Sequence, residues 1–417
     1  MLSNSWLKKY LLPGFIFHFL VIGGGYGTGR ELVEFFLLLG PKNGILGMIV
    51  STIIWCVVLA CTFELSRQFR SYDYRSFLIK ILGRGWIFYE ITYLIGLVLV
   101  ISVLGSASGN LVMEVLDLPT IVGTIAMILM IGVLSFFGSR VIEVFLSYWS
   151  IFLYLVFIIL VIWINSIYGN QISNNFSLTE EPASWLKNGI MYAAYNVGPV
   201  AAILFCLTSI KTRKEALISG GLAGIIAIIP GFMIFYSLVS FYPNINQETI
   251  PTNFLLDKIG STSFKFIFQL ILFGTFIETG VGLIHGFNER ISNWLKSDRG
   301  QELSRISRFI ISILFLIISI FIAEKIGLVD VFLSQFGFDL STFFINDPGI
   351  IKIFGEIGIA FLLFVVGLEL NIGKFSKRIW SVLKKHKIIL MESLNASCRI
   401  NYNIVTFYGF IRTCSLI

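Results

Sequence analysis

Residues 15–36 read FIFHFLVIGGGYGTGRELVEFF, an apolar run long enough to cross a bilayer that is interrupted at its centre. Five glycines fall between Gly23 and Gly29, and Arg30, Glu31 and Glu34 follow at once. Hydrocarbon tolerates non-helical backbone only where protein buries it or where it lines a wet cavity. Charged side chains at that depth are costly and usually functional. The stretch therefore predicts a transmembrane helix broken into two halves that line a site.

A broken helix offers two kinds of backbone ligand. The N–H groups at the start of the second half, near Thr28 to Glu31, are predicted to be free to hold an anionic group. The last carbonyl groups of the first half, near Val21 to Gly24, are predicted to be able to coordinate a cation.

Composition places the chain in the membrane. Hydrophobic residues make up 56% of the 417 positions and charged residues only 13%, which is typical of a polytopic membrane protein. The net charge of +7 would suggest nucleic acid in a soluble protein, but here the basic residues lie in short loops between apolar runs, where they set orientation. We therefore expect the lipid bilayer as a partner and no nucleic acid.

Soluble catalysis has little support in this sequence. The glycine run lacks the last glycine of a dinucleotide fingerprint and follows a membrane-length apolar run rather than a strand. No phosphate-loop lysine, nucleophile elbow or metal-ligand spacing is present. We expect no enzyme, no catalytic residue and no cofactor.

Apolar runs of about 20 residues predict ten spans. Nine are assigned at 11–39, 44–65, 86–112, 119–137, 143–166, 186–210, 216–242, 263–287 and 306–323, and the tenth at 350–371. Alternate loops are rich in Lys and Arg, which predicts a cytoplasmic N-terminus. Leaving 326–349 as an external loop or partly buried segment keeps the basic stretch Lys374 to Lys387 inside. Both termini are then cytoplasmic, in a bacterial cytoplasmic membrane.

Ten spans divide into two sets of five. Because five is odd, the second set starts on the opposite side of the membrane, as in an inverted repeat. This arrangement predicts a second break in span six, where AAYNVGP occupies 193–199 and both proline and glycine weaken a helix. Gly25 and Asn196 are 171 residues apart, and the same offset relates Ser106 to Ile277. The predicted fold is an all-α polytopic membrane protein with a 5+5 inverted repeat and broken helices one and six.

Arg30 and Glu34 are four residues apart and so lie on one helix face. One interpretation is a structural ion pair that closes the break. The other is that Arg30 or Glu31 contacts a charged substrate, and both interpretations can hold together.

Glu278 lies deep inside an apolar span, with Thr275, Gly282 and His285 on nearly the same face. A lone buried carboxyl group is a natural proton carrier, whereas one paired with a cation or an arginine stays ionised. The alternative is a structural hydrogen bond to a neighbouring helix. We expect Glu278 and the span-one break to form one site, and His285 to lie at the membrane interface.

Three motifs resemble the YkvI-like family of bacterial membrane proteins: IGGGYGTGRELVEFF, YAAYNVGPVAAILF and FIETGVGLIHGFNER. That family belongs to the amino acid–polyamine–organocation superfamily, whose members have the LeuT-type inverted-repeat fold. The likeness covers roughly residues 5–342. It implies a secondary transporter, a symporter for a small solute such as an amino acid or amine, coupled to sodium or protons.

Members of the superfamily bind substrate and ion at the breaks of spans one and six, with span eight completing the cation site. The corresponding candidates here are Gly23, Gly24, Gly25, Tyr26, Gly27, Thr28, Gly29, Arg30, Glu31 and Glu34 in span one, Tyr195, Asn196, Gly198 and Pro199 in span six, and Thr275, Glu278 and Thr279 in span eight. The one metal site that this resemblance implies is a sodium site near Gly23, Thr275 and Glu278.

The end of the chain departs from that pattern. The segment NDPGIIKIFGEIGIAFLLFVVGLELNIGKF resembles an N-terminal helix of the monovalent cation:proton antiporter family. Either a gene fusion or a sequencing or assembly join would produce this antiporter-like segment. We therefore divide the chain into a transporter core at 1–342, an antiporter-like helix and basic segment at 343–390, and an unassigned tail at 391–417.

Three functions remain open at this point. The leading hypothesis is a solute:cation symporter. A monovalent cation:proton antiporter is supported only by Gly355 to Leu370, and a membrane sensor that binds solute without moving it is the third.

Overall fold

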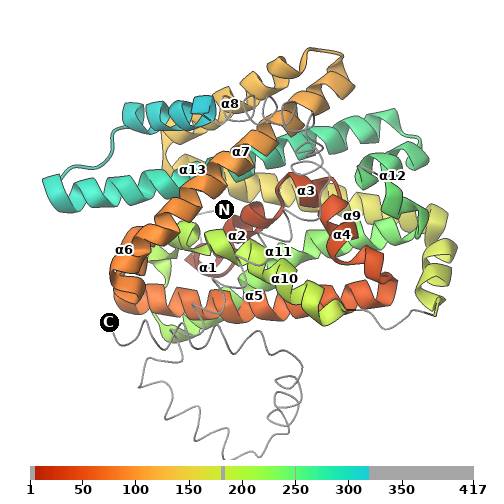
Figure 1. Cartoon of the computed structure of the whole chain (residues 1–417), viewed down its shortest axis with the longest axis horizontal. Coiled ribbons are helices and arrows are strands. Elements are labelled where there is room, and N and C mark those ends of the chain that lie inside the picture. The colour runs from red at the N-terminus through yellow and green to blue at the C-terminus, as the bar shows by residue number, and fades with distance from the viewer. Residues whose placement is uncertain (1–4, 180–183, 249, 319–417) are drawn as a thin grey trace, which may run out of the picture. The chain divides into compact units, whose positions relative to one another are not determined.

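The computed structural model describes residues 5–179, 184–248 and 250–318, all within a single unit (Figure 1). These residues form helices joined by short turns, and no strand occurs among them. The predicted span at 350–371, the segment 326–349 and the tail lie outside the described residues.

The first span is broken, as the glycine run predicts. It begins after the short helix α1 (Ser5–Tyr10) and consists of α2 (Leu12–Val21), α3 (Gly24–Gly27) and α4 (Arg30–Phe35), followed by the 3-10 turn η1 (Leu37–Leu39). Pro13 lies in the first turn of α2, where its missing N–H costs nothing. Gly29 has φ of +79°, a left-handed conformation that glycine adopts without strain, and it separates α3 from α4.

The remaining elements follow the predicted spans closely. They are α5 (Pro41–Phe69), α6 (Tyr74–Leu82), η2 (Gly83–Gly85), α7 (Trp86–Leu116), α8 (Thr120–Phe137), α9 (Ser139–Ser177), α10 (Trp185–Val197), η3 (Gly198–Ser209), α11 (Arg213–Val239), η4 (Asn244–Gln247), α12 (Pro251–Ile259) and α13 (Thr262–Arg299), and a further helix covers 305–318. Among the described residues, six helices are long and apolar enough to span a membrane, or seven if the bent pair α10 and η3 counts as one span.

Span six is bent rather than straight. The segments Trp185–Ala194 and Gly198–Ser209 meet at 54°, and the chain changes there from α-helix to 3-10 helix. Pro199 accounts for this change because it has no N–H to donate and its ring clashes with the preceding turn. The bend lies at the position that the repeat offset predicts.

Two of the predicted loops, at 66–85 and 243–262, contain short helices that the apolar pattern did not indicate. Helix α6 begins at an Asp73 cap, whose carboxylate accepts a hydrogen bond of 2.8 Å from the Ser76 N–H. Helix α12 begins at Pro251 and ends at Gly260, which is left-handed with φ of +73°. Both helices are too short to be read from hydrophobic periodicity alone.

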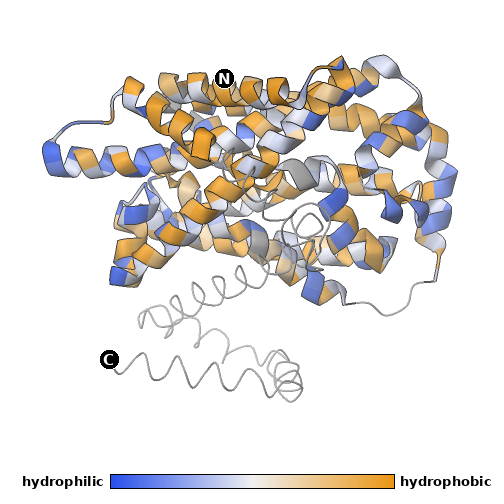
Figure 2. Ribbon diagram, turned by 45° about the horizontal axis from the view of Figure 1, so that its top comes forward, coloured by the Kyte–Doolittle hydropathy of each residue, from blue (hydrophilic) through white to orange (hydrophobic). Residues whose placement is uncertain are grey.

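Apolar side chains cover the outside of the bundle as well as its core. Residues such as Ile53, Val57 and Ile162 are exposed, as expected for helices that face lipid. Figure 2 shows hydrophobic residues along the long helices and hydrophilic residues gathered mainly near their ends. Helix α13 is the most buried of the six spanning helices and packs against α2, α7, α8, α9 and η3, so its polar residues lie at the centre of the bundle.

Candidate functional site

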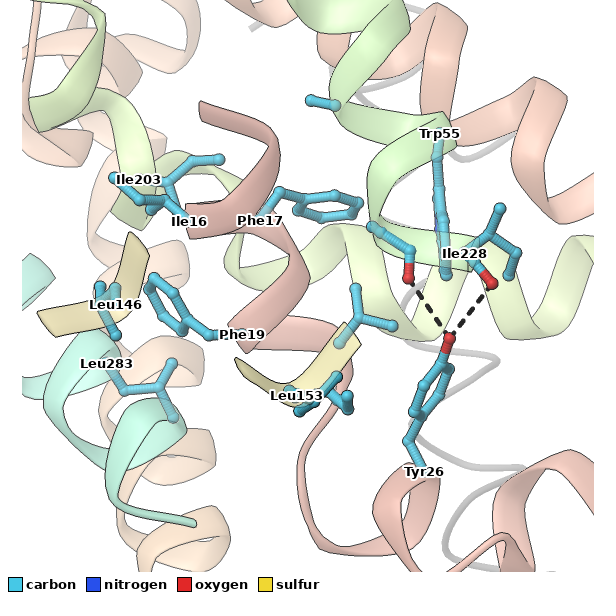
Figure 3. Close-up of a cluster of buried hydrophobic side chains, with 14 of the residues drawn as sticks. Ile16, Phe17, Phe19, Tyr26, Trp55, Leu146, Leu153, Ile203, Ile228 and Leu283 are labelled. Atoms are coloured by element: carbon cyan, nitrogen blue, oxygen red, sulfur yellow. Dashed lines mark hydrogen bonds between the residues drawn. The ribbon is translucent and has the colours of Figure 1, made fainter. Parts of the chain in front are cut away.

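Tyr26, the side chain in the middle of the glycine run, is fully buried against α11. Its hydroxyl donates to the carbonyl oxygens of Ala227 and Ile228, at 3.3 and 3.4 Å (Figure 3). A Cβ atom added to Gly231 would lie 2.2 Å from this hydroxyl oxygen. The glycine therefore leaves the space that the phenol ring occupies.

A third carbonyl group of α11, that of Ile226, lies next to these two acceptors in the chain. Pro230 lies inside the helix and has no N–H to pair with the carbonyl of Ile226. The hydroxyl of Tyr154, on α9, donates to that carbonyl instead. The carbonyl group that Pro230 leaves unpaired therefore joins α11 to α9. Tyr26 joins the first break to the same part of α11.

The backbone of the first break is partly paired within itself. The Gly27 N–H donates to the Gly23 carbonyl and the Gly29 N–H to the Tyr26 carbonyl, both at 3.1 Å. Two of the backbone groups proposed above as ligands thus already have partners. Gly27 also packs tightly on α13, because a Cβ atom there would lie 2.4 Å from the Leu272 side chain.

Arg30 and Glu34 form the ion pair that their spacing predicts. The guanidinium group of Arg30 also donates to the carbonyl oxygens of Asn246 and Glu248, at 3.1 and 3.0 Å. The pair therefore fastens the loop after α11 to the second half of the broken helix. It is a brace at least, and its contact with substrate remains a prediction.

The same loop contacts the break a second time, through Thr252 of α12. The Thr252 N–H donates to the Thr28 carbonyl at 3.1 Å, and its hydroxyl donates to the same oxygen. Helix α12 is therefore fastened to the break through the Thr28 carbonyl group.

Glu31 is buried beside this braced region, with 8% of its surface exposed. Its Oε2 atom has no hydrogen-bond partner among the described residues. A buried carboxyl oxygen without a partner is costly, so this atom is a candidate ligand for a hydrogen-bond donor on a solute.

Glu278 is fully buried at the centre of α13. The Ser150 hydroxyl on α9 donates to its Oε1 atom at 3.0 Å, whereas Oε2 has no hydrogen-bond partner among the described residues. The next residue, Thr279, donates through its hydroxyl to the carbonyl oxygen of Phe19 at 2.8 Å. Span five therefore contacts span eight at Glu278 and span one contacts it at the next residue, Thr279. A single site formed by Glu278 and the span-one break remains a prediction.

The other predicted residues of spans six and eight have local partners. The Asn196 side-chain amide donates to the Tyr192 carbonyl one turn earlier, and the Thr275 hydroxyl donates to the Leu272 carbonyl. The Gly198 carbonyl accepts from the Tyr89 hydroxyl at 3.2 Å. The structure describes the backbone but not the side-chain surroundings of Gly24, Gly25 and Tyr195. Pro199 lies at the bend.

Sequence reasoning missed several buried polar residues around this centre. His18 lies on α2 with its ring centroid 5.4 Å from that of Tyr154, and neither of its ring nitrogens has a hydrogen-bond partner among the described residues. Ser150 and Tyr154 lie one turn apart on α9. Serine and tyrosine are common in apolar spans. Only the spacing of four residues between Ser150 and Tyr154 could have indicated a polar face on α9.

One expectation about α13 is wrong, and an ion pair between α7 and α13 was not expected. His285, expected at the interface, is fully buried and packs edge-on against the Phe205 ring at 4.6 Å. Glu90, near the start of α7, forms an ion pair of 2.8 Å with Arg290 of α13. Both positions depend on neighbouring helices, which periodicity along one helix does not reveal.

An apolar groove of about 310 Å³ lies between α2, α9 and α11, lined by Leu11, Phe15, Ile151, Tyr154, Leu155 and Ile226. Leu155 is more than half exposed, so the groove opens on the outer, lipid-facing surface. It is distinct from the polar centre at Glu278. Among the described residues, no group of three or more His, Cys, Asp or Glu side chains is arranged to hold a metal ion.

Comparisons with known proteins agree with this architecture. No protein-family model matches the chain. The uncharacterized membrane protein YkvI of Bacillus subtilis (strain 168) is 26% identical over 296 residues, covering 67% of this chain and 80% of the relative. The antiporter resemblance gains no support from these matches, and its segment lies outside the described residues.

Solved structures give the fold. MhsT, in a crystal structure with L-phenylalanine, superposes with a TM-score of 0.61 at 14% identity, covering 85% of this chain and 88% of that one. The chain has the LeuT-type fold. The manganese transporter of Eremococcus coleocola also shares this LeuT-type fold, with a TM-score of 0.54 at 13% identity and coverage of 86% and 76%. At such low identity the likeness extends to the fold, with its broken helices, and not to the ligand.

Proposed function

We propose that this membrane protein is a secondary active transporter of a small amino acid or amine, coupled to sodium or protons. The observation that carries the proposal is the buried carboxyl group of Glu278, at the point where span eight contacts spans one and five. A carboxyl group without a charged partner is costly at the centre of a membrane bundle. Its retention there is explained if it takes up and releases a cation during each transport cycle.

The broken first span provides the second part of the proposal. Helix breaks in this kind of fold place backbone polar groups and side chains beside a mid-membrane site. Glu31, in the first turn of α4 after the break, offers a buried carboxyl oxygen without a partner among the described residues. We propose that this oxygen accepts a hydrogen bond from the ammonium group of the solute, and that Gly23 to Gly29 and Asn196 to Pro199 line the remainder of the site.

The fold neighbours support a transporter in general and differ in ligand. One was solved with L-phenylalanine and the other is a manganese transporter. An amine-containing solute is favoured here because a buried carboxyl oxygen without a partner is suited to accept a hydrogen bond from an ammonium ion. The distribution of Lys and Arg supports a bacterial cytoplasmic membrane with both termini inside.

Transport into proteoliposomes tests this function directly. We expect a pooled set of radiolabelled amino acids and polyamines to accumulate when a sodium or pH gradient is imposed, and to collapse when the gradient is dissipated. Accumulation of sodium driven by a pH gradient without solute would favour an antiporter. Binding of a solute to the purified protein without any uptake would favour a sensor.

A further inference from the structure

The polar residues of α13 continue beyond Glu278 along one face. Gly282, His285 and Glu289 follow at four, seven and eleven residues, which are spacings that return to the same side of a helix. Glu278 and His285 are separated by about 10 Å along the axis at 1.5 Å per residue. The stripe leads from the centre of the bundle to the basic end of α13, which the charge pattern predicts to be cytoplasmic.

Several groups along this stripe are suited to relay a proton. Neither ring nitrogen of His285, nor the side-chain amide of Asn288 beside it, has a hydrogen-bond partner among the described residues. The His285 Nε2 atom lies 3.8 Å from Glu289 Oε1, and Arg308 pairs with that carboxylate at 2.7 Å. Buried polar groups are normally hydrogen-bonded, often to ordered water, so these side chains are suited to hold a chain of water molecules.

The surroundings of Glu278 favour the neutral carboxyl group. Its one hydrogen-bond partner among the described residues is the neutral Ser150 hydroxyl, and no Lys or Arg among those residues forms an ion pair with it. Burying an ionised carboxylate without a partner costs far more than burying a neutral one. The centre of the bundle is therefore suited to a bound proton.

Other titratable groups lie on several of the elements near the stripe. Helix α8 contains none. On the other elements packed against α13 such groups include Tyr154 and Glu143 on α9, His18 on α2, Tyr26 on α3, Cys206 on η3, and Tyr89, Glu90 and Tyr93 on α7. Glu90 pairs with Arg290 of α13 at 2.8 Å.

The Phe19 ring lies across the stripe between Glu278 and His285. A Cβ atom added to Gly282 would lie 1.7 Å from Cε2 of this ring, so the ring covers the helix face that joins the two residues. Figure 3 shows Phe19 pointing toward Leu146 of α9 and Leu283 of α13, whereas Phe17 points toward Trp55. Both phenylalanines are fully buried, but only Phe19 interrupts the polar stripe.

We propose that the coupling ion is a proton carried by Glu278, and that its route to the basic end of α13 through His285 is closed here by the Phe19 ring. The proposal rests on the transport function above and identifies its coupling ion. The O–H bond of the Glu278 carboxyl group breaks, and the proton passes through water to the His285 imidazole and then to bulk solvent. Glu278 remains as a carboxylate until a proton from the opposite side of the membrane binds it.

Displacement of α2 would open this route. The Thr279 hydroxyl holds the Phe19 carbonyl at 2.8 Å, so the ring and the first half-helix are fastened to α13 together. Moving the half-helix away removes the ring from the stripe and leaves Glu278 in contact with the basic end. One movement then couples proton release to rearrangement of the broken span.

Infrared spectroscopy of the purified protein tests the bound ion without any solute. We expect the C=O stretch of a protonated carboxyl group to be present at neutral pH, reduced in Glu278→Gln and shifted in Ser150→Ala, which removes the hydrogen bond to Oε1. Ser147→Ala, one turn away on α9, is the matched control because its hydroxyl donates within its own helix to the Glu143 carbonyl. Replacing choline with sodium should leave the band unchanged. Disappearance of the Glu278 band in sodium, or its absence in both media, would overturn the proposal.

Proton leak in proteoliposomes tests the route. Vesicles containing a trapped pH dye are given a pH gradient and a potassium diffusion potential, with no solute. We expect Phe19→Ala to acidify several-fold faster than the native protein, Phe17→Ala to match the native protein, and Phe19→Ala combined with Glu278→Gln to lose the leak. Equal rates for Phe19→Ala and Phe17→Ala, or a leak that persists in the double variant, would show that this route does not exist.

These measurements separate the ion from the transport function. Solute accumulation driven by sodium at equal pH would refute the proton as the coupling ion and would leave the proposed transport function standing. If Phe19→Ala leaks protons only when Glu278 is present, and no gradient drives solute uptake, the proposed transport function is refuted and the proton route stands.

Discussion

The hydroxyl of Thr279 donates a hydrogen bond of 2.8 Å to the carbonyl oxygen of Phe19 and so joins α13 to the last turn of α2. The acceptor belongs to the end of a helix, where carbonyl groups lack a partner from the next turn. The donor is the residue next to Glu278. A hydrogen bond between the first half-helix and span eight therefore lies directly beside the proposed ion-binding carboxyl group.

Removing this hydroxyl should loosen the first half-helix. Thr279→Val keeps the side-chain shape and leaves the Phe19 carbonyl without its donor, which costs about 1–3 kcal/mol for a buried group. We expect a lower thermal unfolding temperature in detergent. Thr52→Val on α5 is the control, because that hydroxyl donates to Met48 of its own helix. Equal destabilisation by the two changes would mean that the Thr279 contact contributes nothing specific.

Two glycines of α11 should respond oppositely to the same substitution. In Gly231→Ala the added methyl group meets the Tyr26 hydroxyl oxygen at 2.2 Å, and we expect a loss of about 1–3 kcal/mol from overpacking. In Gly221→Ala the methyl group has nothing within 4 Å, and we expect a gain of up to about 1 kcal/mol from helix propensity. Thermal unfolding of both variants checks this. A neutral Gly231→Ala would show that Tyr26 moves aside freely.

The loop after α11 should detach when Arg30 loses its planar guanidinium group. Arg30 donates to two loop carbonyl groups while it pairs with Glu34, and a lysine ammonium cannot reproduce that fork. We expect Arg30→Lys to speed the thiol labelling of Ile245→Cys, placed at a loop residue that is fully buried, in a background without native cysteines. Lys258→Ala, on α12, should leave the rate unchanged. Unchanged labelling in Arg30→Lys would mean that other contacts hold the loop.

Glu278→Gln should separate binding from energy coupling. Glutamine keeps nearly the same shape and the Ser150 hydrogen bond but cannot bind and release a proton. We expect the protein to fold, to exchange labelled solute across the membrane, and to lose gradient-driven accumulation. Glu114→Gln, at a more exposed position that pairs with Lys265, should retain accumulation. Full gradient-driven uptake by Glu278→Gln, with unchanged pH dependence, would make this carboxyl group structural.

Topology at the C-terminal end remains a prediction from charge. If 350–371 alone crosses the membrane after span nine, Ser381 lies in the cytoplasm with the basic stretch Lys374 to Lys387. A cysteine introduced at Ser381 should react with a membrane-impermeant maleimide only after the membrane is opened. Reaction in intact cells would place Ser381 outside the cell, so that the two termini would lie on opposite sides of the membrane.

Sequence periodicity was sufficient for the spans among the described residues and for both breaks. A transmembrane helix satisfies its backbone hydrogen bonds within one segment, so local runs of apolar residues determine where each helix begins and ends. Glycine and proline act through their own backbone geometry, which is equally local. For that reason the breaks near Gly23 to Gly29 and at Pro199 were predictable without any knowledge of neighbouring helices.

Partners across the bundle were decided only by the tertiary structure. Ser150 and Glu278 are 128 residues apart, and Tyr26 meets acceptors about 200 residues later in the chain. Their contacts depend on the rotation of each helix about its own axis, which is set by packing against several neighbours at once. The sequence alone determined that Glu278 would be a buried carboxyl group. Close packing between helices decided that serine would be its hydrogen-bond partner and that the Phe19 ring would lie between it and His285.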